Sequence, residues 1–263
     1  MPQRFSDFLE YIAEIRPLEG SYFGRCVSMR WDAWRVVRLI NAKINRLVHG
    51  APGTVLDVGC GIGIYERELR RRWPAARIVG CDFSKKNILA AKAVEPSAFF
   101  LRGDAEMLPV GDGTVDVAFA VEVMEHFLHP EKVASELARV VRPGGLLFVV
   151  APLAPPIPCI RAASRCVTRF IGSQVIAKDG LKEHMRIYSV GSLAREFKDR
   201  WNVKSRVTFN LMTFAVAALE KIAPGPAGRI TERHQRLLDA LDFLCGHFLY
   251  AKGLFVFERK GKK

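Results

Sequence analysis

The spacing of hydrophobic residues changes twice along the chain. Residues 1–50 place apolar side chains three or four positions apart, which is typical of amphipathic helices. From residue 54 to residue 152, short continuous apolar runs alternate with helical stretches, and after Pro152 this alternation is lost. Residues 1–50 contain two such apolar helix faces, and the one nearer the core comprises Trp34, Val37, Ile40, Ile44 and Leu47.

The middle segment predicts a parallel sheet. Its runs VLDVG, VAFAVEV and LLFVV are continuously apolar, as expected of strands covered by helices on both faces. Helices are expected up to Arg72, over 85–93 and over 130–141, and Pro143-Gly144-Gly145 is expected to turn into the fifth strand. Such alternation indicates an α/β fold with a Rossmann-like, doubly wound sheet. The late runs VKSRVTFN and LFVFERK bring the expected strands to seven, mostly parallel.

These periods divide the chain into four segments. Residues 1–50 are expected to form a helical substrate or cap segment, and residues 51–152 the core. Residues 153–200 are predicted to be a basic helical insertion after the fifth strand, following a segment with four prolines in eight residues. Residues 201–263 are expected to supply the strands and helices that complete the sheet.

Charge is the unusual feature of the composition. The formal net charge is +13, and residues 153–210 hold eleven Lys and Arg against four Asp and Glu. Such a bias favours an anionic partner, either a membrane surface, a phosphorylated substrate or nucleic acid, although a solvated surface explains it equally well. The apolar face and arginine flank of 160–177 fit a membrane surface, a lipophilic substrate, or a lid that packs on the domain.

Targeting and redox signals are weak. No apolar run reaches the ~18 to 20 residues that a spanning helix requires, and the N-terminus has no signal-peptide core. The six cysteines show no CxxC pair or zinc spacing. We therefore expect reduced thiols, no metal site, and a cytoplasmic protein, with a peripheral position at the inner membrane surface as the alternative.

A glycine-rich loop follows the first predicted strand. Asp57 precedes Gly59, Gly61 and Gly63, and a helix is expected directly after them. Backbone N–H groups at a helix start favour a polar or anionic ligand, although a tight turn needs glycines too. The spacing is GxGxG rather than the GxGxxG of dinucleotide sites, so no pyrophosphate cradle is completed.

Two acids follow the next two strands. Asp82 ends RIVGCD, where a carboxylate can accept hydrogen bonds from both hydroxyls of a ribose. Alternatively it caps the following helix, as Ser84 could equally do. Asp104 follows the third strand, where a turn-forming Asp is the alternative.

Taken in order, DVGCGIG, the Asp82 and Asp104 segments, VEVMEHF and RPGG resemble the motifs of class I S-adenosylmethionine-dependent methyltransferases. The branch is the one that includes the menaquinone and ubiquinone methyltransferases. The resemblance covers residues 54–152 and implies S-adenosylmethionine as cofactor. The cofactor-binding residues that it implies are Asp57, Gly59, Cys60, Gly61, Gly63, Asp82, Phe83, Asp104, Ala105, Val121 and Glu122.

Methyl transfer from a sulfonium needs alignment more than acid–base chemistry. A base is required only where the acceptor must lose a proton, and no metal is needed. His126, His184 and Tyr188 are the candidate catalytic residues, with Glu122 behind them. For His126 the alternative is a brace of the loop after the fourth strand, and for each of the others it is no contact with substrate.

The acceptor is the least determined part. The basic insertion and the family branch favour a small, lipophilic, isoprenoid or lipid-like acceptor, with a polar metabolite, a glycan or RNA as alternatives. Nucleic acid is disfavoured, because VEVM stands where an amine-methylating NPPY tetrapeptide would be, and no aromatic-rich basic stripe is present. Two alternative functions from other classes are a nicotinamide-dependent oxidoreductase and a non-catalytic methyltransferase-like partner subunit. The oligomeric state is left open.

Overall fold

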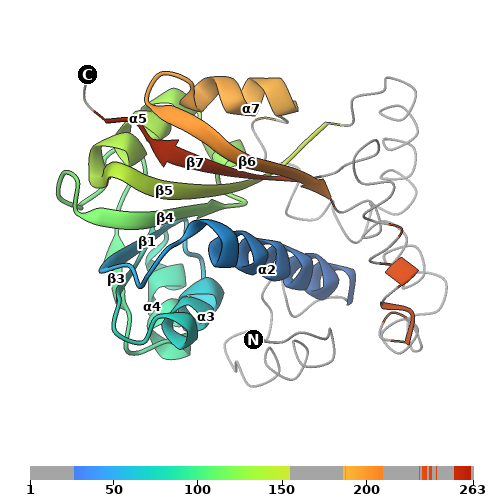
Figure 1. Cartoon of the computed structure of the whole chain (residues 1–263). Coiled ribbons are helices and arrows are strands. Elements are labelled where there is room, and N and C mark those ends of the chain that lie inside the picture. The colour runs from blue at the N-terminus through green and yellow to red at the C-terminus, as the bar shows by residue number, and fades with distance from the viewer. Residues whose placement is uncertain are drawn as a thin grey trace. The chain divides into compact units, whose positions relative to one another are not determined.

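The computed structural model describes residues 27–154, 186, 188–209, 231, 233–235, 237–238, 241 and 252–261. These residues form a seven-stranded sheet of order β3-β2-β1-β4-β5-β7-β6 (Figure 1). The ladders from β3 to β5 are parallel. The fold class predicted from the hydrophobic pattern is therefore confirmed. The strands are β1 (Thr54–Val58), β2 (Arg77–Asp82), β3 (Phe99–Arg102), β4 (Val115–Val121), β5 (Val141–Pro152), β6 (Trp201–Phe209) and β7 (Lys252–Arg259).

The strand order reverses direction between β1 and β4. The connections through α3 and α4 step outward from β1 to β3, whereas α5 connects β4 to β5 on the other side. Right-handed crossovers in opposite directions place their helices on opposite faces of a sheet. A crevice at the carboxyl ends of β1 and β4, the topological switch point, is where such folds bind ligands. The helices whose bounds the structure describes are α2 (Val27–Leu47), α3 (Ile64–Arg72), α4 (Lys85–Val94), α5 (Pro130–Val140) and α7 (Val190–Phe197).

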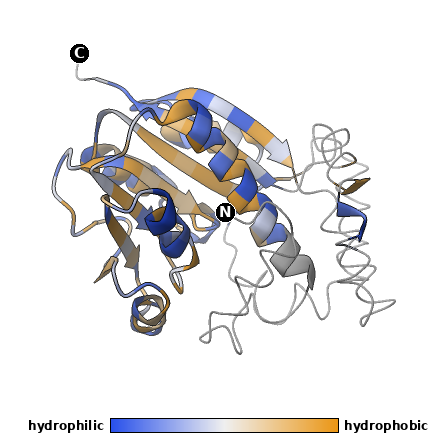
Figure 2. Ribbon diagram, turned by 60° about the horizontal axis from the view of Figure 1, so that its bottom comes forward, coloured by the Kyte–Doolittle hydropathy of each residue, from blue (hydrophilic) through white to orange (hydrophobic). Residues whose placement is uncertain are grey.

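The core lies between the sheet and these helices. Strands β1 and β4, and β5 from Gly145 to Ala151, are almost wholly buried, and these strands are predominantly hydrophobic (Figure 2). Phe119 and Phe148 stack across the β4–β5 ladder with ring centroids 5.0 Å apart. From α5, Val133 and Leu137 are fully buried, one helical turn apart on one face. Burying such side chains contributes about 1.5 to 3 kcal/mol each, and this is what holds the helix on the sheet.

The start of β5 corrects one prediction. Pro143-Gly144-Gly145 is not a turn before the strand but part of it. The β4–β5 register shifts between Val115 and Val117, so the extra residues form a bulge opposite Asp116. Gly144 has φ of 76°, and a Cβ on Gly145 would come within 2.8 Å of the Asp116 carbonyl oxygen. Glycine is therefore needed for the bulge as much as for a turn.

The described residues include only part of the predicted N-terminal helices and of the predicted insertion. Helix α2 buries Trp34, Val37, Ile40 and Ile44 on one face, as their spacing predicts, and Leu47 is half-buried. The helices expected before residue 27 and over 160–177 lie outside the described residues. In the part of the chain that the structure describes, no helix is long and apolar enough to cross a bilayer.

The chain divides into two compact units. Residues 39–151, 190–206 and 254–263 form the unit that contains the glycine loop, Asp82, Asp104 and His126. Tyr188 and the first part of α2 belong to the other unit.

Candidate cofactor and active site

The glycine loop joins β1 to α3 and is tied to the end of β2. The N–H groups of Gly59 and Cys60 both donate to the carbonyl of Cys81, at 2.8 and 3.1 Å. A Cβ on Gly59 would lie 2.4 Å from a methyl of Val123, and one on Gly63 would lie 2.9 Å from the backbone of Ala91. Both glycines are therefore dictated by close packing.

Gly61 differs from its neighbours. Its φ is 54°, yet a Cβ built there would meet nothing within 4 Å. The loop therefore presents bare backbone to open space at its middle residue. A ligand can approach the main chain there without meeting a side chain, which fits the amino-acid end of S-adenosylmethionine.

Asp82 connects this loop to the next helix. Its Oδ2 accepts a hydrogen bond from the N–H of Gly61 at 2.9 Å. Its Oδ1 accepts from the N–H of Ser84 at 2.8 Å and from the side-chain amide of Asn87 at 3.1 Å. Ser84 itself caps α4 by accepting from the N–H of Asn87. Asp82 thus supports the helix start and the glycine loop together, and it is only half-buried.

Apolar side chains lie exposed beside the ends of β2 and β3. Phe83 is 71% exposed and Met107 is 77% exposed, which is unusual for large apolar residues. The guanidinium of Arg102 lies 5.8 Å from the centroid of the Phe83 ring. Asp104 is exposed, and its Oδ1 accepts from the N–H of Glu106 at 2.9 Å, whereas Ala105 is buried. Flat apolar surface next to an exposed carboxylate suits a purine that carries an amine.

Two carboxyl groups lie buried beneath the loop. Asp57 at the end of β1 and Glu66 in α3 are at most 2% exposed. Oδ2 of Asp57 and both carboxyl oxygens of Glu66 have no hydrogen-bond partner among the described residues. Burial, and after it the charge of Asp82, raises the pKa of Asp57 to about 8. Burial and the charge of Asp57 raise the pKa of Glu66 well above its usual value. Burial therefore favours the protonated form of both carboxyl groups.

The thiols in the site are inert. Cys60 and Cys81 are free and buried. Burial raises the pKa of Cys81 to about 11 and that of Cys60 further above its ordinary value. Both thiols remain protonated at neutral pH and do not act as nucleophiles.

The chain leaves β4 with a strained residue. Val121 is buried at the strand's end, and Glu122 follows with φ of 53°, a conformation uncommon outside glycine. The N–H of Glu122 donates to the carbonyl of Val150 at 2.8 Å, which fixes this backbone against β5. Strained residues of this kind collect at ligand sites. The positive φ also ends β4 before the expected VEV run is complete.

The three candidate bases do not lie in one element. His126 is exposed in the short 3-10 helix η3 (Met124–His126), in the compact unit that holds the glycine loop. Tyr188 is buried in an isolated parallel bridge with Leu153, not in a helix as its spacing from His184 indicated. The bridge prevails because the N–H of Ala154 donates to the carbonyl of Tyr188 at 2.7 Å. His184 lies outside the described residues.

Sequence reasoning missed three residues that shape the site. Glu66 was read as part of an ordinary helix, although Gly80, in the strand beneath it, signals space for a side chain. Glu136 and Arg139 in α5 were not singled out, although their opposite charges at i,i+3 indicate a pair.

The part of the chain that holds this site matches a known protein family. Residues 56–149 match the family described as methyltransferase domain. They form a class I S-adenosylmethionine-dependent methyltransferase domain. The methyltransferase domain covers the whole predicted cofactor site, from Asp57 to Glu122, and this match favours the methyltransferase prediction over the nicotinamide-dependent alternative.

Relatives match this domain rather than their full length. A ubiquinone biosynthesis O-methyltransferase of Rhizobium etli is 39% identical over 99 residues, 36% of this chain and 39% of that protein. A 2-methyl-6-phytyl-1,4-hydroquinone methyltransferase of Synechocystis is 40% identical over 102 residues, 37% of this chain and 32% of that protein. The chain spans between about a third and a half of the length of the curated relatives that it matches.

The likeness to solved structures extends further along the chain. The crystal structure of geranyl diphosphate C-methyltransferase from Streptomyces coelicolor has a TM-score of 0.58 and 15% identity, and the match covers 84% of this chain and 80% of that one. At that identity the likeness shows the fold alone.

Proposed function

We propose that this chain is an enzyme that transfers the methyl group of S-adenosylmethionine to a small, lipophilic acceptor of the quinone or isoprenoid kind. The observation that carries the cofactor half is the bare backbone at Gly61, tied to the carboxylate of Asp82, inside a methyltransferase domain. The acceptor half is supported by relatives named for ubiquinone biosynthesis and for a phytyl hydroquinone.

Each site residue has a proposed task. The loop from Gly59 to Gly63 borders the amino-acid end of the cofactor. Asp82, half-buried at the end of β2, offers its carboxylate to the ribose hydroxyls. Phe83 and Asp104 border the purine, with the backbone of Ala105. The remaining proposed cofactor contacts are Asp57, Cys60, Val121 and Glu122.

When bound, S-adenosylmethionine supplies a methyl group that is already activated by its sulfonium. The protein's own work is then to align the acceptor in line with that methyl group and to exclude water, and orientation can contribute about 7 to 11 kcal/mol. For a phenolic acceptor, the hydroxyl proton must leave. His126, exposed after β4, is the proposed base, with Tyr188 and His184 as the other candidates.

The flanking segments are proposed to receive the acceptor. Residues 1–50 form the proposed cap, 153–200 the proposed substrate-side insertion and 201–263 the completion of the sheet around the 51–152 core. The excess of Lys and Arg over 153–210 supports contact with an anionic head group or an anionic membrane surface. A cytoplasmic location, peripheral at the inner membrane surface, agrees with this charge.

A tritiated methyl-transfer assay on fractionated cell extract tests the proposal. We expect label to enter the organic phase, and we expect the Asp82→Ala variant to lose this transfer. Label confined to a polar metabolite or glycan fraction, or to RNA, would overturn the lipophilic acceptor. Stabilisation of the chain by NADH, with none by S-adenosylhomocysteine in the same thermal-shift experiment, would overturn the methyltransferase proposal itself.

A further inference from the structure

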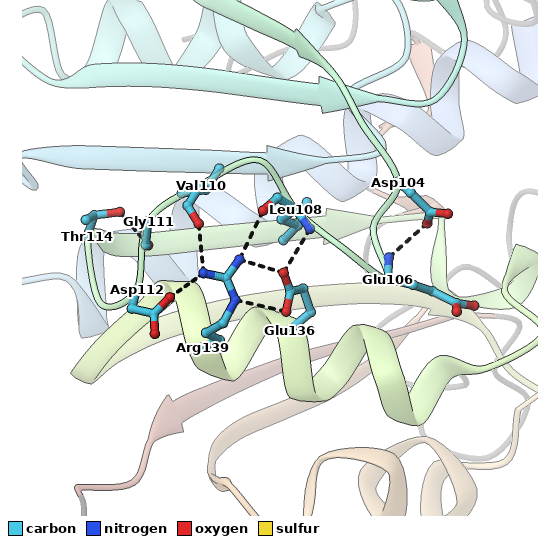
Figure 3. Close-up of polar contacts among 9 residues, drawn as sticks. All are labelled: Asp104, Glu106, Leu108, Val110, Gly111, Asp112, Thr114, Glu136 and Arg139. Carbon is cyan, nitrogen blue, oxygen red and sulfur yellow. Dashed lines mark hydrogen bonds and ion pairs between the residues drawn. The ribbon is translucent and has the colours of Figure 1, made fainter.

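Arg139, in the last turn of α5, binds a segment far from it in sequence. Its guanidinium has five N–H groups, and each has an acceptor (Figure 3). Nε and Nη2 donate to the two carboxyl oxygens of Glu136, at 3.0 and 2.6 Å. Nη1 and Nη2 donate to the carbonyls of Val110 and Leu108, at 2.9 and 3.0 Å. Nη1 also contacts the carboxylate of Asp112.

Glu136 holds the same segment from its other side. Its Oε1 accepts a hydrogen bond from the N–H of Leu108 at 2.9 Å, so both backbone polar groups of Leu108 are bonded to the Arg139–Glu136 pair. The backbone carbonyl of Arg139 accepts from the N–H of Gly113 at 2.9 Å. The hydrogen bonds from Arg139 keep the pKa of Glu136 below its usual value, so its carboxylate stays charged and able to accept.

The segment has little regular secondary structure, and its other bonds are mostly short-range, apart from the N–H of Gly103, which donates to the carbonyl of Asp82 at 3.2 Å, and the ion pair of Glu106 with Lys132. Between β3 and β4, residues 103–114 contain only the isolated Asp104–Met107 bridge as regular pairing among the described residues. Leu108 buries its side chain, whereas Asp104 and Met107 are exposed. Backbone polar groups outside ladders and helices need partners, and here the Arg139–Glu136 pair supplies several of them.

The pair is not what holds α5 in place. The helix is fixed by its buried apolar face, which includes Val133 and Leu137. Arg139 and Glu136 are partly exposed, with side chains 32% and 14% accessible. Apart from their bonds to each other, their hydrogen bonds run to the backbone of Leu108 and Val110 and to Asp112, so the structural effect of the pair falls first on the segment that it bonds.

We propose that the Arg139–Glu136 pair positions Asp104 and Ala105 for recognition of the purine end of the cofactor, without touching the cofactor. This inference rests on the proposed function, because it needs an adenine-bearing cofactor beside Asp104. Asp104 lies four residues before Leu108, so the pair fixes the backbone close to the carboxylate that would accept from the purine amine. Loss of the pair removes the bonds to Leu108 and Val110, and we expect the carboxylate of Asp104 to be held less firmly, by its local bonds alone.

The matched control is Arg142, a second partly exposed arginine paired to a carboxylate. Its Nε donates to Oδ1 of Asp116 at 2.7 Å, and Oδ2 of Asp116 accepts from the N–H groups of Gly53 and Thr54. Those contacts lie at the start of β1, the opposite end of the sheet from the glycine loop. Although the Arg142 backbone lies near Gly113, its side chain bonds only Asp116 and Pro143 among the described residues, so Arg142→Met removes an ion pair without removing a hydrogen bond to residues 103–114.

The test compares binding of S-adenosylhomocysteine with that of S-inosylhomocysteine, in which the purine amine is replaced by a carbonyl. In Arg139→Met we expect S-adenosylhomocysteine to bind about tenfold more weakly, the loss of one or two net hydrogen bonds. We expect the preference for adenine over hypoxanthine to fall by a similar factor. Glu136→Gln should act in the same direction, and Arg139→Lys should be intermediate, since an ammonium cannot bond the carboxylate and both carbonyls as a fork does.

The outcomes separate the possible failures. Faster hydrogen exchange confined to residues 103–114 in Arg139→Met, with Arg142→Met unchanged, supports the positioning role. An unchanged adenine preference in Arg139→Met and Glu136→Gln overturns it, whatever happens to the melting temperature. Failure of the wild-type chain to bind S-adenosylhomocysteine overturns the proposed function instead.

Discussion

The two regions proposed to contact the cofactor are held in place by different means. The glycine loop is fixed mainly by close packing of its backbone, since Gly59 and Gly63 lie against Val123 and Ala91 without room for a methyl group, and Asp82 adds one side-chain bond. The 103–114 segment is fixed by side chains that reach it from α5. Changes in the first region should therefore reduce the stability of the whole domain, whereas changes in the second should act locally.

The two regions also differ in how their buried or half-buried carboxyl groups are hydrogen-bonded. Glu66, beneath the glycine loop, is fully buried, and neither of its carboxyl oxygens has a hydrogen-bond partner among the described residues. Glu136, beside the 103–114 segment, is bonded by Arg139 and by a backbone N–H. The pKa of Glu66 is raised by burial, and that of Glu136 is lowered by its hydrogen bonds. The stability contributed by the loop region should thus fall as pH rises above the ordinary carboxyl pKa, whereas that contributed by the segment should not.

The largest effect is expected from Gly63→Ala. Its Cβ would lie 2.9 Å from the Cα of Ala91, at φ of 82°, so both overpacking and backbone strain act. We expect a loss of about 3 kcal/mol in the free energy of unfolding, measured by urea denaturation. Gly61→Ala is the control: its positive φ is similar but its surroundings are open, so about 1 kcal/mol is expected. Equal losses would show that packing does not hold the loop.

Asp82→Ala should act on binding. The carboxylate bonds the loop at Gly61 and is proposed to bond the ribose, so its removal should weaken S-adenosylhomocysteine binding by about 2 to 3 kcal/mol. Isothermal titration calorimetry measures this. Ser84→Ala, which removes the cap of α4 but leaves Asp82 in place, should leave the dissociation constant unchanged. An unchanged constant in Asp82→Ala itself would mean that the carboxylate is only structural.

Glu66→Gln should change how stability depends on pH. The folded chain keeps a proton on Glu66 that the unfolded chain releases near pH 4, so the native state binds more protons and stability falls as pH rises. Glutamine has no proton to lose. As pH rises above the unfolded value and toward the raised folded one, the variant should therefore gain stability relative to wild type, by up to about 1.4 kcal/mol per pH unit.

Glu136→Gln provides the contrast for that measurement. The pKa of Glu136 is lowered in the folded state, so its contribution is present above the unfolded value and is lost only as pH falls through the folded one. Its difference from wild type should be constant from about pH 5 to about pH 8. A flat profile for Glu66→Gln as well would show that the buried carboxyl is ionised and stabilised by a partner.

Local features could be predicted from the sequence, and tertiary ones could not. The continuous apolar run before Gly59 defined β1 and the loop because strand and turn depend on neighbouring residues. The bulge at Gly144 was missed because pairing with β4 produces it. Glu66 was missed because its burial depends on the space at Gly80, in another element. The contact of Arg139 with Leu108 joins residues 31 positions apart, which no local pattern indicates.

The smallest effect is expected from Lys132→Met, which tests whether any charge between α5 and the segment would hold it. The ammonium of Lys132 lies 3.4 Å from the carboxylate of Glu106, and the Lys132 side chain is 57% exposed. Such a pair contributes about 0.5 kcal/mol or less, and it bonds no backbone group of the segment. The adenine preference and the exchange rates of residues 103–114 should therefore match wild type. If Lys132→Met instead reproduced Arg139→Met, attraction between opposite charges, rather than the hydrogen bonds to Leu108 and Val110, would explain the order of the segment.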